Sequence, residues 1–398
     1  MKPVDAHLAE ILRTVRPLDP VEIDLDRALG AVLAESVTSP VALPPFDNSA
    51  MDGYAVRAKD VETATEDRPV LLPVVADVPA GEHAPHVIEP GSVTRIMTGA
   101  PVPEGADAVV PVEWTDGGTV RVAIHRPAEA GNAIRRSGED VRAGDVVLDS
   151  GTLIGPAQLG VLAGVGRRAV RALPRPRVLV LSTGAELVDP GLPLGPGQIW
   201  ESNSYTLVAA VREAGGEAYR RSAVGDDPAL FLEILTGLLP EADAVITSGG
   251  ISMGAYEPVK EALTPLGTVR FEKVAMQPGM PQGFGVVGER EVPIFTLPGN
   301  PVSSYVSFVL YVRPALARMR GLPAGPPPMV TATTTAALRS PSGKRSYLRG
   351  VLDGDRVAPV RGQGSHQLAA LAAANALIVV PEDATEVPAG AAVEVIPL

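Results

Sequence analysis

Three turns that contain glycine are the residues of this sequence best suited to bind a ligand. They read Ser182-Thr183-Gly184, Ser248-Gly249-Gly250 and Pro298-Gly299-Asn300, and each follows an apolar run typical of a buried strand. Glycine lets a backbone approach a ligand closely, and N–H groups at the start of a following helix attract anions. The three turns together therefore predict a phosphate-bearing ligand. None is a Walker loop or a GxGxxG sequence, which argues against an ordinary ATPase or NAD enzyme.

Carboxylates stand close to these turns in the sequence. Glu186 lies just past the first turn, Asp226 and Asp227 end a later strand segment, and Glu257 follows the Ser-Gly-Gly turn. A single acid after a turn is usually a helix cap. Several acids on one rim of a sheet instead favour a divalent cation such as Mg²⁺, which neutralises phosphate oxygens and helps to generate a nucleophilic water. The residues alone thus predict a metal-assisted phosphoryl or nucleotidyl enzyme.

Composition excludes several other kinds of chemistry. The chain has no cysteine, so disulfides, thiolate metal sites and cysteine nucleophiles are ruled out. Its five histidines are scattered without the spacing of metal ligands. A net charge of −12 argues against a nucleic-acid partner, which requires a basic face. No hydrophobic signal segment begins the chain and no apolar run has the length of a membrane span, so we expect a cytoplasmic protein without membrane insertion.

Strands that alternate with helices between residues 177 and 320 predict a doubly wound, mostly parallel α/β sheet. Ligands of such sheets bind beyond the carboxyl ends of the strands, where the three turns stand. The expected strands are 177–181, 217–224, 243–247, 268–275 and 292–297, and the expected helices are 204–214, 228–239, 257–263 and 303–319.

Outside residues 177–320 the pattern of apolar and polar residues is different. Apolar residues at helical spacing predict an amphipathic helix over 4–15, and a second short helix is expected over 26–35. Residues 41–141 alternate apolar and polar between Pro/Gly turns, as in a small β-rich module. A helix is expected to start at Gly155-Pro156, residues 321–328 form a stiff linker, and 329–398 are expected to form a small β-barrel or sandwich.

A set of motifs closely resembles the MoeA family, the molybdopterin molybdenumtransferases, to which the E domain of gephyrin also belongs. The motifs follow the family's order and cover essentially the whole chain, and details such as Gly254-Ala255-Tyr256-Glu257 and the stretch 276–281 are similar to its actinobacterial branch. They are Pro44-Pro45-Phe46-Asp47-Asn48-Ser49-Ala50-Met51-Asp52-Gly53-Tyr54-Ala55, Arg95-Ile96-Met97-Thr98-Gly99-Ala100-Pro101, Ser182-Thr183-Gly184-Ala185-Glu186, Ser248-Gly249-Gly250-Ile251-Ser252 and Leu297-Pro298-Gly299-Asn300-Pro301-Val302-Ser303-Ser304.

The resemblance implies an elongated homodimer that cleaves adenylylated molybdopterin, inserts molybdate into its dithiolene and releases AMP with the help of Mg²⁺ or another divalent cation. The cleft would lie between the α/β and C-terminal domains of one subunit and the inserted module of the other. The implied domains are a dimerisation domain made of 1–43 and 142–172, an inserted β-rich domain over 44–141, a molybdopterin-binding α/β domain over 173–326, and a C-terminal β-barrel over 327–398.

The resemblance also implies roles for individual residues. Glu186, Asp226 and Glu257 would hold the metal and handle phosphate, with Glu257 standing where an aspartate is usual. The residues expected to take part in catalysis are Asp52, Thr98, Asp140, Glu186, Asp226, Glu257 and Lys273, the first three acting from the partner subunit. The expected substrate-binding residues are Ser182, Thr183, Gly184, Ser248, Gly249, Gly250, Pro298, Gly299, Asn300, Ser303, Arg349 and Ser365.

The chain departs from the family at Met276-Gln277-Pro278-Gly279-Met280-Pro281, where many members read Lys-Pro-Gly-Lys-Pro and the lysines bind molybdate. Gln277 and Met280 therefore mark an altered molybdate site. Two lost ammonium groups remove charge-assisted hydrogen bonds of roughly 1.5–3 kcal/mol each. Lysine is scarce in this chain, and drift toward arginine would have placed arginine at these positions.

Three functions are compatible with this pattern. The first is a working molybdenum insertase in which Arg349 carries more of the molybdate binding. The second is a gephyrin-like dimeric scaffold that binds a partner protein's short tail, with insertase activity weakened or lost, and the neutral stretch at 276–281 motivates it. The third is a related nucleotidyl enzyme that makes the adenylylated intermediate.

Overall fold

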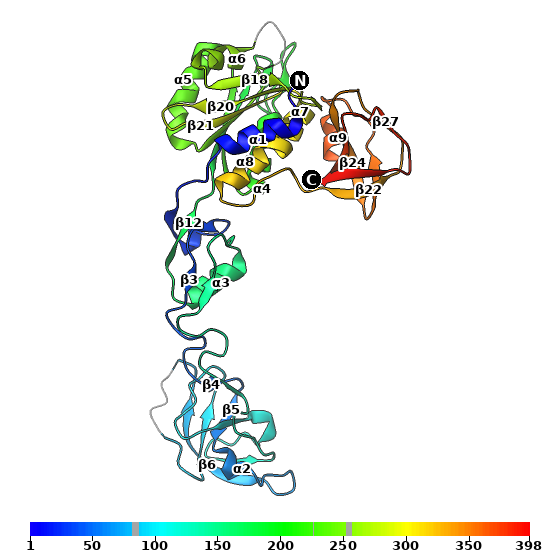
Figure 1. Ribbon diagram of the computed structural model, residues 1–398. Coiled ribbons are helices and arrows are strands. Elements are labelled where there is room, and N and C mark those ends of the chain that lie inside the picture. The colour runs from blue at the N-terminus through cyan, green and yellow to red at the C-terminus, as the bar shows by residue number, and fades with distance from the viewer. Residues whose placement is uncertain (82–86, 226, 252–256) are drawn as a thin grey trace. The chain divides into compact units, whose positions relative to one another are not determined.

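The computed structural model describes residues 1–81, 87–225, 227–251 and 257–398. The chain forms two units with separate cores (Figure 1). The larger unit comprises Met1–Ile23, Gly30–Ala34 and Arg171–Leu398, and the smaller unit comprises Asp24–Leu29 and Glu35–Val170.

A six-stranded sheet forms the centre of the larger unit, in the order β16-β13-β17-β21-β20-β18. The first four strands are parallel, while β20 runs antiparallel to both of its neighbours. The expected doubly wound, mostly parallel sheet is thereby confirmed. The strands are β16 (Glu217–Val224), β13 (Arg177–Thr183), β17 (Ala244–Ser248), β21 (Val292–Leu297), β20 (Pro281–Val287) and β18 (Val269–Lys273).

Helices cover both faces of this sheet (Figure 1). On one face, Leu179 and Val245 pack with Phe231 of α5 and Val259 of α6; on the other, Val180 packs within the core formed with the remaining helices. A strand buried on both faces is apolar at successive positions, which explains the continuous apolar run of β13. The helices are α5 (Pro228–Leu238), α6 (Pro258–Leu263), α1 (Val4–Thr14), α4 (Asn203–Glu213), and α7 (Pro301–Ser307), which continues through the π-helix Phe308–Val312 into α8 (Arg313–Met319).

The C-terminal part of the larger unit is a closed five-stranded β-barrel, because β24 pairs with both β25 and β26. Closure removes the exposed strand edges that a small open sheet would present. The short strand β19 (Met276–Gln277) joins β24 in parallel and links the α/β part to the barrel. The barrel strands and their helix are β22 (Val330–Thr334), β24 (Arg345–Asp353), β25 (Arg356–Pro359), β26 (Ala376–Val380), β28 (Ala392–Pro397) and α9 (Leu368–Ala372).

The smaller unit is built on a five-stranded sheet in the order β8-β5-β7-β6-β9. Its core holds the fully buried Tyr54, whose hydroxyl donates to the carbonyl oxygen of Gly118 at 2.9 Å. The elements are β5 (Gly53–Val56), β6 (Val70–Val78), β7 (Val93–Ile96), β8 (Ala108–Pro111), β9 (Arg121–Ile124), α2 (Ala58–Val61) and α3 (Pro156–Gly164).

Short strand pairs complete the two units. They are β3 (Val37–Thr38) with β11 (Val146–Leu148), β4 (Asn48–Ser49) with β10 (Ile134–Arg135), β14 (Leu187–Val188) with β15 (Ile199–Trp200), β23 (Leu338–Arg339) with β27 (Glu386–Val387), and β2 (Val32–Leu33) with β12 (Ala169–Leu173). The strand β1 spans Val21–Asp24.

The helix expected over 26–35 is wrong. A single 3-10 turn, Leu25–Arg27, occupies this stretch and is followed by β2 at Val32–Leu33. Gly30 stops any helix because its φ of 80° lies in the left-handed region, and its carbonyl oxygen accepts a hydrogen bond from Nη2 of Arg320 at 2.9 Å. The helices expected at 4–15, from 155 and over 303–319 are confirmed, the last with its start at Pro301.

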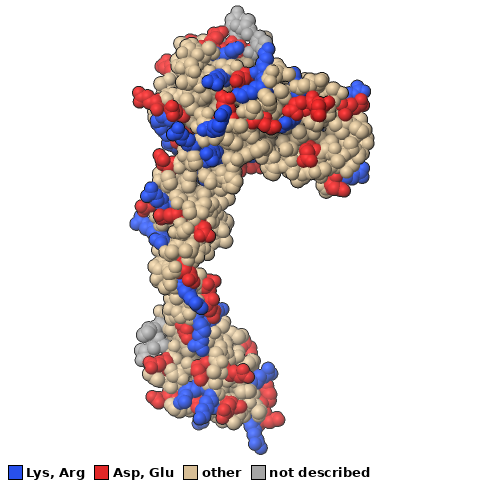
Figure 2. Space-filling view, viewed as in Figure 1, with Lys and Arg blue, Asp and Glu red and all other residues tan. Residues whose placement is uncertain are grey.

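Among the described residues, no helix combines the length and the apolar character that crossing a bilayer requires. On the face shown in Figure 2, lysine and arginine side chains are interspersed with acidic ones in each unit.

Candidate active site

The three glycine turns lie side by side at the carboxyl ends of strands in the α/β sheet. They follow β13, β17 and β21, which are adjacent parallel strands, and the register places Ser182 opposite Ser248 and Ser248 opposite Leu297. Their carboxyl ends are therefore aligned, as expected for a ligand site of an open α/β sheet.

Glycine is required at the second turn. Gly249 has a φ of 95°, and a Cβ atom there would lie 2.6 Å from the carbonyl oxygen of Thr183. Gly250 has a φ of 67° and also faces Thr183. The Thr183 hydroxyl is buried and has no hydrogen-bond partner among the described residues, so it is available to a ligand.

Sequence reasoning missed two polar residues that organise these turns. Asn203, at the start of α4, donates from Nδ2 to Oγ of Ser248 at 2.8 Å and to the carbonyl oxygen of Gly299 at 2.7 Å. Glu201 is buried, and its carboxylate accepts from Oγ of Ser182 at 2.9 Å, from the backbone N–H of Ser204 at 2.8 Å and from the Ser204 hydroxyl. The signal in the sequence was the polar run Glu-Ser-Asn-Ser ahead of a helix, which is typical of a cap.

A cavity of about 1090 Å³ opens above these turns within the larger unit. Its wall combines the turns with the 276–281 segment and a loop of the barrel. The predicted site residues that line it are Ser182, Thr183, Gly184, Glu186, Ser248, Gly249, Gly250, Glu257, Gln277, Met280, Pro298, Gly299, Asn300, Ser303 and Ser365.

The barrel loop is attached directly to the third turn. Nδ2 of Asn300 donates to Oγ of Ser365 at 3.0 Å, and the backbone N–H of Val302 donates to the Ser365 carbonyl oxygen at 3.0 Å. Arg349 does not line the cavity. It is fully buried, its Nη2 donates to the carbonyl oxygens of Gly362 and Gly364 at 2.6 and 3.1 Å, and burial lowers its pKa. Arg349 thus holds the loop that carries Ser365.

The neutral segment 276–281 connects β18 to β20, and hydrogen bonds from neighbouring residues hold it in place. The backbone N–H of Val274 donates to the Met280 carbonyl oxygen at 2.8 Å, and Nε2 of the buried Gln282 donates to the Gly279 carbonyl oxygen at 2.7 Å. The Gln277–Pro278 peptide bond is cis. Gln277 and Met280 both line the cavity, so the altered residues face the same space as the glycine turns.

Two of the three carboxylates predicted to hold a metal lie in the described part of the chain. Glu186 and the buried Glu257 line the cavity, whereas Asp226 lies outside the described residues. Asp227 caps α5, because its Oδ1 accepts from the backbone N–H of Ala229 at 2.9 Å. Within the described part of the chain, no three carboxylate or histidine side chains stand close enough together to hold a metal ion. The carboxylates of Glu186 and Glu257 have the right chemistry for a hard cation, which would need further ligands.

Lys273 is exposed at the end of β18 and does not line the cavity; its carbonyl oxygen accepts from the backbone N–H of Lys2 at 2.8 Å. The smaller unit holds the other three predicted residues. Oδ1 of Asp52 accepts from the backbone N–H and from the hydroxyl of Thr98, at 2.7 and 2.8 Å. These two hydrogen bonds, the backbone one first, lower the pKa of Asp52. Asp140 is exposed in a turn, where its N–H donates to the Leu43 carbonyl oxygen at 3.1 Å.

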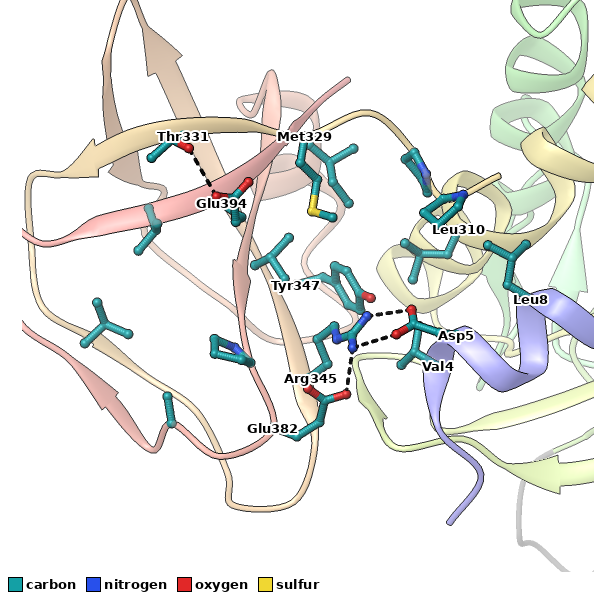
Figure 3. A pocket seen from close by; sticks show the side chains of 18 of the residues that line it. Val4, Asp5, Leu8, Leu310, Met329, Thr331, Arg345, Tyr347, Glu382 and Glu394 are labelled. Carbon is teal, nitrogen blue, oxygen red and sulfur yellow. Dashed lines mark hydrogen bonds and ion pairs between the residues drawn. The ribbon is translucent and has the colours of Figure 1, made fainter. Parts of the chain in front are cut away.

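A second cavity, of about 640 Å³, lies between α1, the π-helix and the barrel of the larger unit (Figure 3). Most of its wall is apolar. The charged residues at its centre are already paired, because Arg345 donates to both carboxylate oxygens of Asp5 at 2.8 and 3.0 Å and lies 3.0 Å from Glu382 (Figure 3). This cavity therefore favours an apolar ligand.

Comparison with known proteins defines the family of the chain. The model of the MoeA N-terminal region (domain I and II) matches residues 2–166, that of a probable molybdopterin binding domain matches 179–318, and that of the MoeA C-terminal region (domain IV) matches 331–398. The chain belongs to the MoeA family.

Individual relatives agree with this assignment. Molybdopterin molybdenumtransferase 2 of Mycobacterium tuberculosis is 50% identical over 403 residues, covering 99% of each chain. Molybdopterin molybdenumtransferase 1 of the same organism is 40% identical over 419 residues, covering 99% of this chain and 98% of that one. A crystal structure of the molybdopterin biosynthesis MoeA protein from Pyrococcus horikoshii is 32% identical, with a TM-score of 0.79 over 99% of this chain and 98% of that one. The expected family and its actinobacterial type are confirmed.

Proposed function

We propose that this chain is a molybdopterin molybdenumtransferase. It binds adenylylated molybdopterin and molybdate in the larger cavity, inserts molybdenum into the dithiolene and releases AMP. The observation that carries this proposal is the meeting of three glycine turns and three carboxylates, Glu186, Glu201 and Glu257, in one cavity at the carboxyl ends of the strands. Membership of a family whose relatives bear the name molybdopterin molybdenumtransferase supports it.

Each part of the cavity has a task in this reaction. The backbone N–H groups of the turns and the free hydroxyl of Thr183 bind phosphate oxygens. Asn203 fixes the second turn against the third, so these donors are held in place before substrate arrives. Arg349 positions the Ser365 loop, which closes the molybdate side.

Glu186 and Glu257 would hold a Mg²⁺ ion, with Asp226 as a third candidate ligand. Two carboxylates suit Mg²⁺, which commonly takes its remaining ligands from water and from a substrate phosphate. When bound, the ion would neutralise charge on the phosphate that is cleaved. Lys273 is proposed as a catalytic residue on the resemblance alone, since it is exposed at the end of β18 and does not line the cavity.

We also propose that the protein is a homodimer in which Asp52, Thr98 and Asp140 of one copy act on substrate bound to the other. Asp52 is held ionised by its two hydrogen bonds from Thr98, which suits a group that orients substrate through its negative charge. The gaps between the three family matches support the proposed boundaries after residues 172 and 326. The dimerisation domain made of 1–43 and 142–172 stays a proposal within the first match.

The test is reconstitution of the reaction. Purified protein given adenylylated molybdopterin, Mg²⁺ and molybdate should release AMP and form molybdenum cofactor, as measured by chromatography and by activation of an apo-nitrate reductase. Absence of both products would overturn the proposal. Incubation with ATP and unmodified molybdopterin is the companion assay, since adenylylation there would instead indicate the nucleotidyl enzyme.

A gephyrin-like scaffold remains the second candidate, and the 640 Å³ cavity is the observation that favours it. Its apolar wall and internally paired charges suit the apolar side chains of a partner protein's short tail. The measurement is a pull-down with the wild-type protein and with Leu8→Asp, which places a charge in the wall. Recovery of the same proteins by both, or of none, would remove this candidate.

A further inference from the structure

Lys344 is the lysine that lies at the larger cavity. It stands in the segment before β24 and lines the wall together with Gln277 and Ser365. Of the lining residues that the structure describes, it is the one lysine or arginine. Its neighbours in the wall include the carboxylates Glu186 and Glu257, so any anion that enters meets more negative than positive side chains.

Backbone pairing fixes Lys344 beside the altered segment. The parallel pairing of β19 with β24 places Met276 opposite Arg345 and Gln277 opposite Ser346. The backbone N–H of Arg345 also donates to the carbonyl oxygen of Ala275 at 2.9 Å. Lys344 therefore emerges next to the bend at which Gln277 and Met280 face the cavity.

The ammonium group of Lys344 has no partner among the described residues. It makes no hydrogen bond or ion pair with any residue in the described ranges, although its side chain is half-buried. The next residue behaves in the opposite way, because Arg345 pairs with Asp5 and Glu382. A partly desolvated cation with no internal partner favours an anionic ligand.

We infer that the ammonium group of Lys344 binds a tetrahedral oxyanion in the larger cavity and supplies the positive charge that Gln277 and Met280 do not. This inference rests on the proposed function for its ligand class. Two sources carry that chemistry, molybdate itself and the phosphate of the adenylylated substrate. Arg349 does not supply this charge at the wall, because its side chain is fully buried beneath the barrel loop and does not line the cavity.

The test compares Lys344→Met with Lys344→Arg and with the control Lys260→Met. Lys260 lies exposed on α6 and does not line the cavity. Binding of molybdate and of AMP is measured separately by equilibrium dialysis, and the melting temperature verifies that each variant is folded. Losing one charge-assisted contact should raise the dissociation constant of one probe by about tenfold or more in Lys344→Met. Lys344→Arg and Lys260→Met should bind nearly as the wild type does.

The two arms identify the source of the oxyanion. Weaker molybdate binding assigns Lys344 to molybdate, and adding Gln277→Lys to Lys344→Met should then restore it. Weaker AMP binding alone assigns Lys344 to the substrate phosphate. If Lys344→Met matches Lys260→Met with both probes, or if the wild type binds neither, the inference is overturned.

Failure of the inference is distinguishable from failure of the proposed function. Wild-type protein that forms cofactor, with a molybdate dependence unchanged by Lys344→Met and unaltered AMP binding, contradicts only the role of Lys344. Binding that depends on Lys344 in a protein that forms no cofactor contradicts only the proposed reaction.

Discussion

A surface carboxylate of the smaller unit shows how a single residue can be prepared for chemistry without burial. Asp52 receives two hydrogen bonds from Thr98, and both favour its charged form. Thr98→Val removes the hydroxyl donor and leaves the backbone one. The pKa of Asp52 should rise toward its ordinary value of 3.8, as followed by NMR titration of its carboxyl carbon. Asp47, whose pKa is lowered chiefly by the N–H of Ser137, is the internal control and should not change.

His7 links stability to pH in the larger unit. Burial, followed by the charge of Lys2, lowers the pKa of His7 to about 4, although Glu272 and Glu10 act in the opposite direction. Its ring packs edge-on against Tyr311 at 4.8 Å. The folded protein thus keeps His7 neutral at a pH where the unfolded chain, with an ordinary pKa of 6.5, takes up a proton.

The free energy of unfolding should therefore fall as the pH is lowered from 6.5 toward 4, by up to about 3 kcal/mol from this residue. His7→Phe has no proton to take up, so its stability should change less over the same range. Urea unfolding of both proteins at several pH values measures the difference. Parallel pH dependences in the two proteins would contradict this account.

At the scale of elements, the turn after β17 depends on a backbone shape that only glycine adopts readily. Gly249→Ala places a Cβ atom 2.6 Å from the Thr183 carbonyl oxygen at a φ of 95°. We expect a loss of about 1–3 kcal/mol in the free energy of unfolding, together with weaker AMP binding, because the first and second turns must separate.

The matched control is Gly237→Ala. Gly237 lies in α5, where an added Cβ atom meets no neighbour within 4 Å. This substitution should stabilise the protein by about 0.5–1 kcal/mol through helix propensity and should leave AMP binding unchanged. A Gly249→Ala variant as stable as Gly237→Ala would show that the turn tolerates a side chain.

The sequence predicts those elements whose signals are local. The strands that end in the glycine turns are apolar runs bounded by turn residues, and their common edge follows from the parallel arrangement. Strand β20 was missed because Gly283 and Gly285 weaken its pattern, yet the close approach of Thr296 at Gly283 and of the Thr268 backbone at Gly285 excludes larger residues.

Residues that depend on packing between distant segments were harder to predict. The local sequence of Glu201 and Asn203 is typical of a cap, whereas their contacts with the turns follow only from folding: Glu201 with the first turn, and Asn203 with the second and third. Lys344 required the pairing of β19 with β24, which joins positions nearly seventy residues apart. Arg349 carries a charge typical of an anion site. It is buried, however, and donates to two carbonyl oxygens, so it supports the barrel loop and does not contact the cavity.

At the scale of the whole molecule, the proposed residues are divided between two units that have separate cores. Asp52, Thr98 and Asp140 belong to the smaller unit, whereas the cavity belongs entirely to the larger one. In the proposed homodimer, each reaction site takes the larger unit of one copy and the smaller unit of the other. If the site is shared in this way, two variants that are each inactive should regain activity when mixed; a site contained within one copy would show no such recovery.

Asp52→Asn and Glu186→Gln should each inactivate the protein when expressed alone. A mixed dimer of the two variants would hold one intact site and one site that carries both substitutions. Random assembly from equal amounts gives mixed dimers for half of the population, so about a quarter of wild-type AMP release should return. Light scattering of the mixture, against a chain mass of 41.2 kDa, verifies the dimer. Dimers without recovered activity would place all the catalytic residues of each site within one copy, and monomers would remove the homodimer from the proposal.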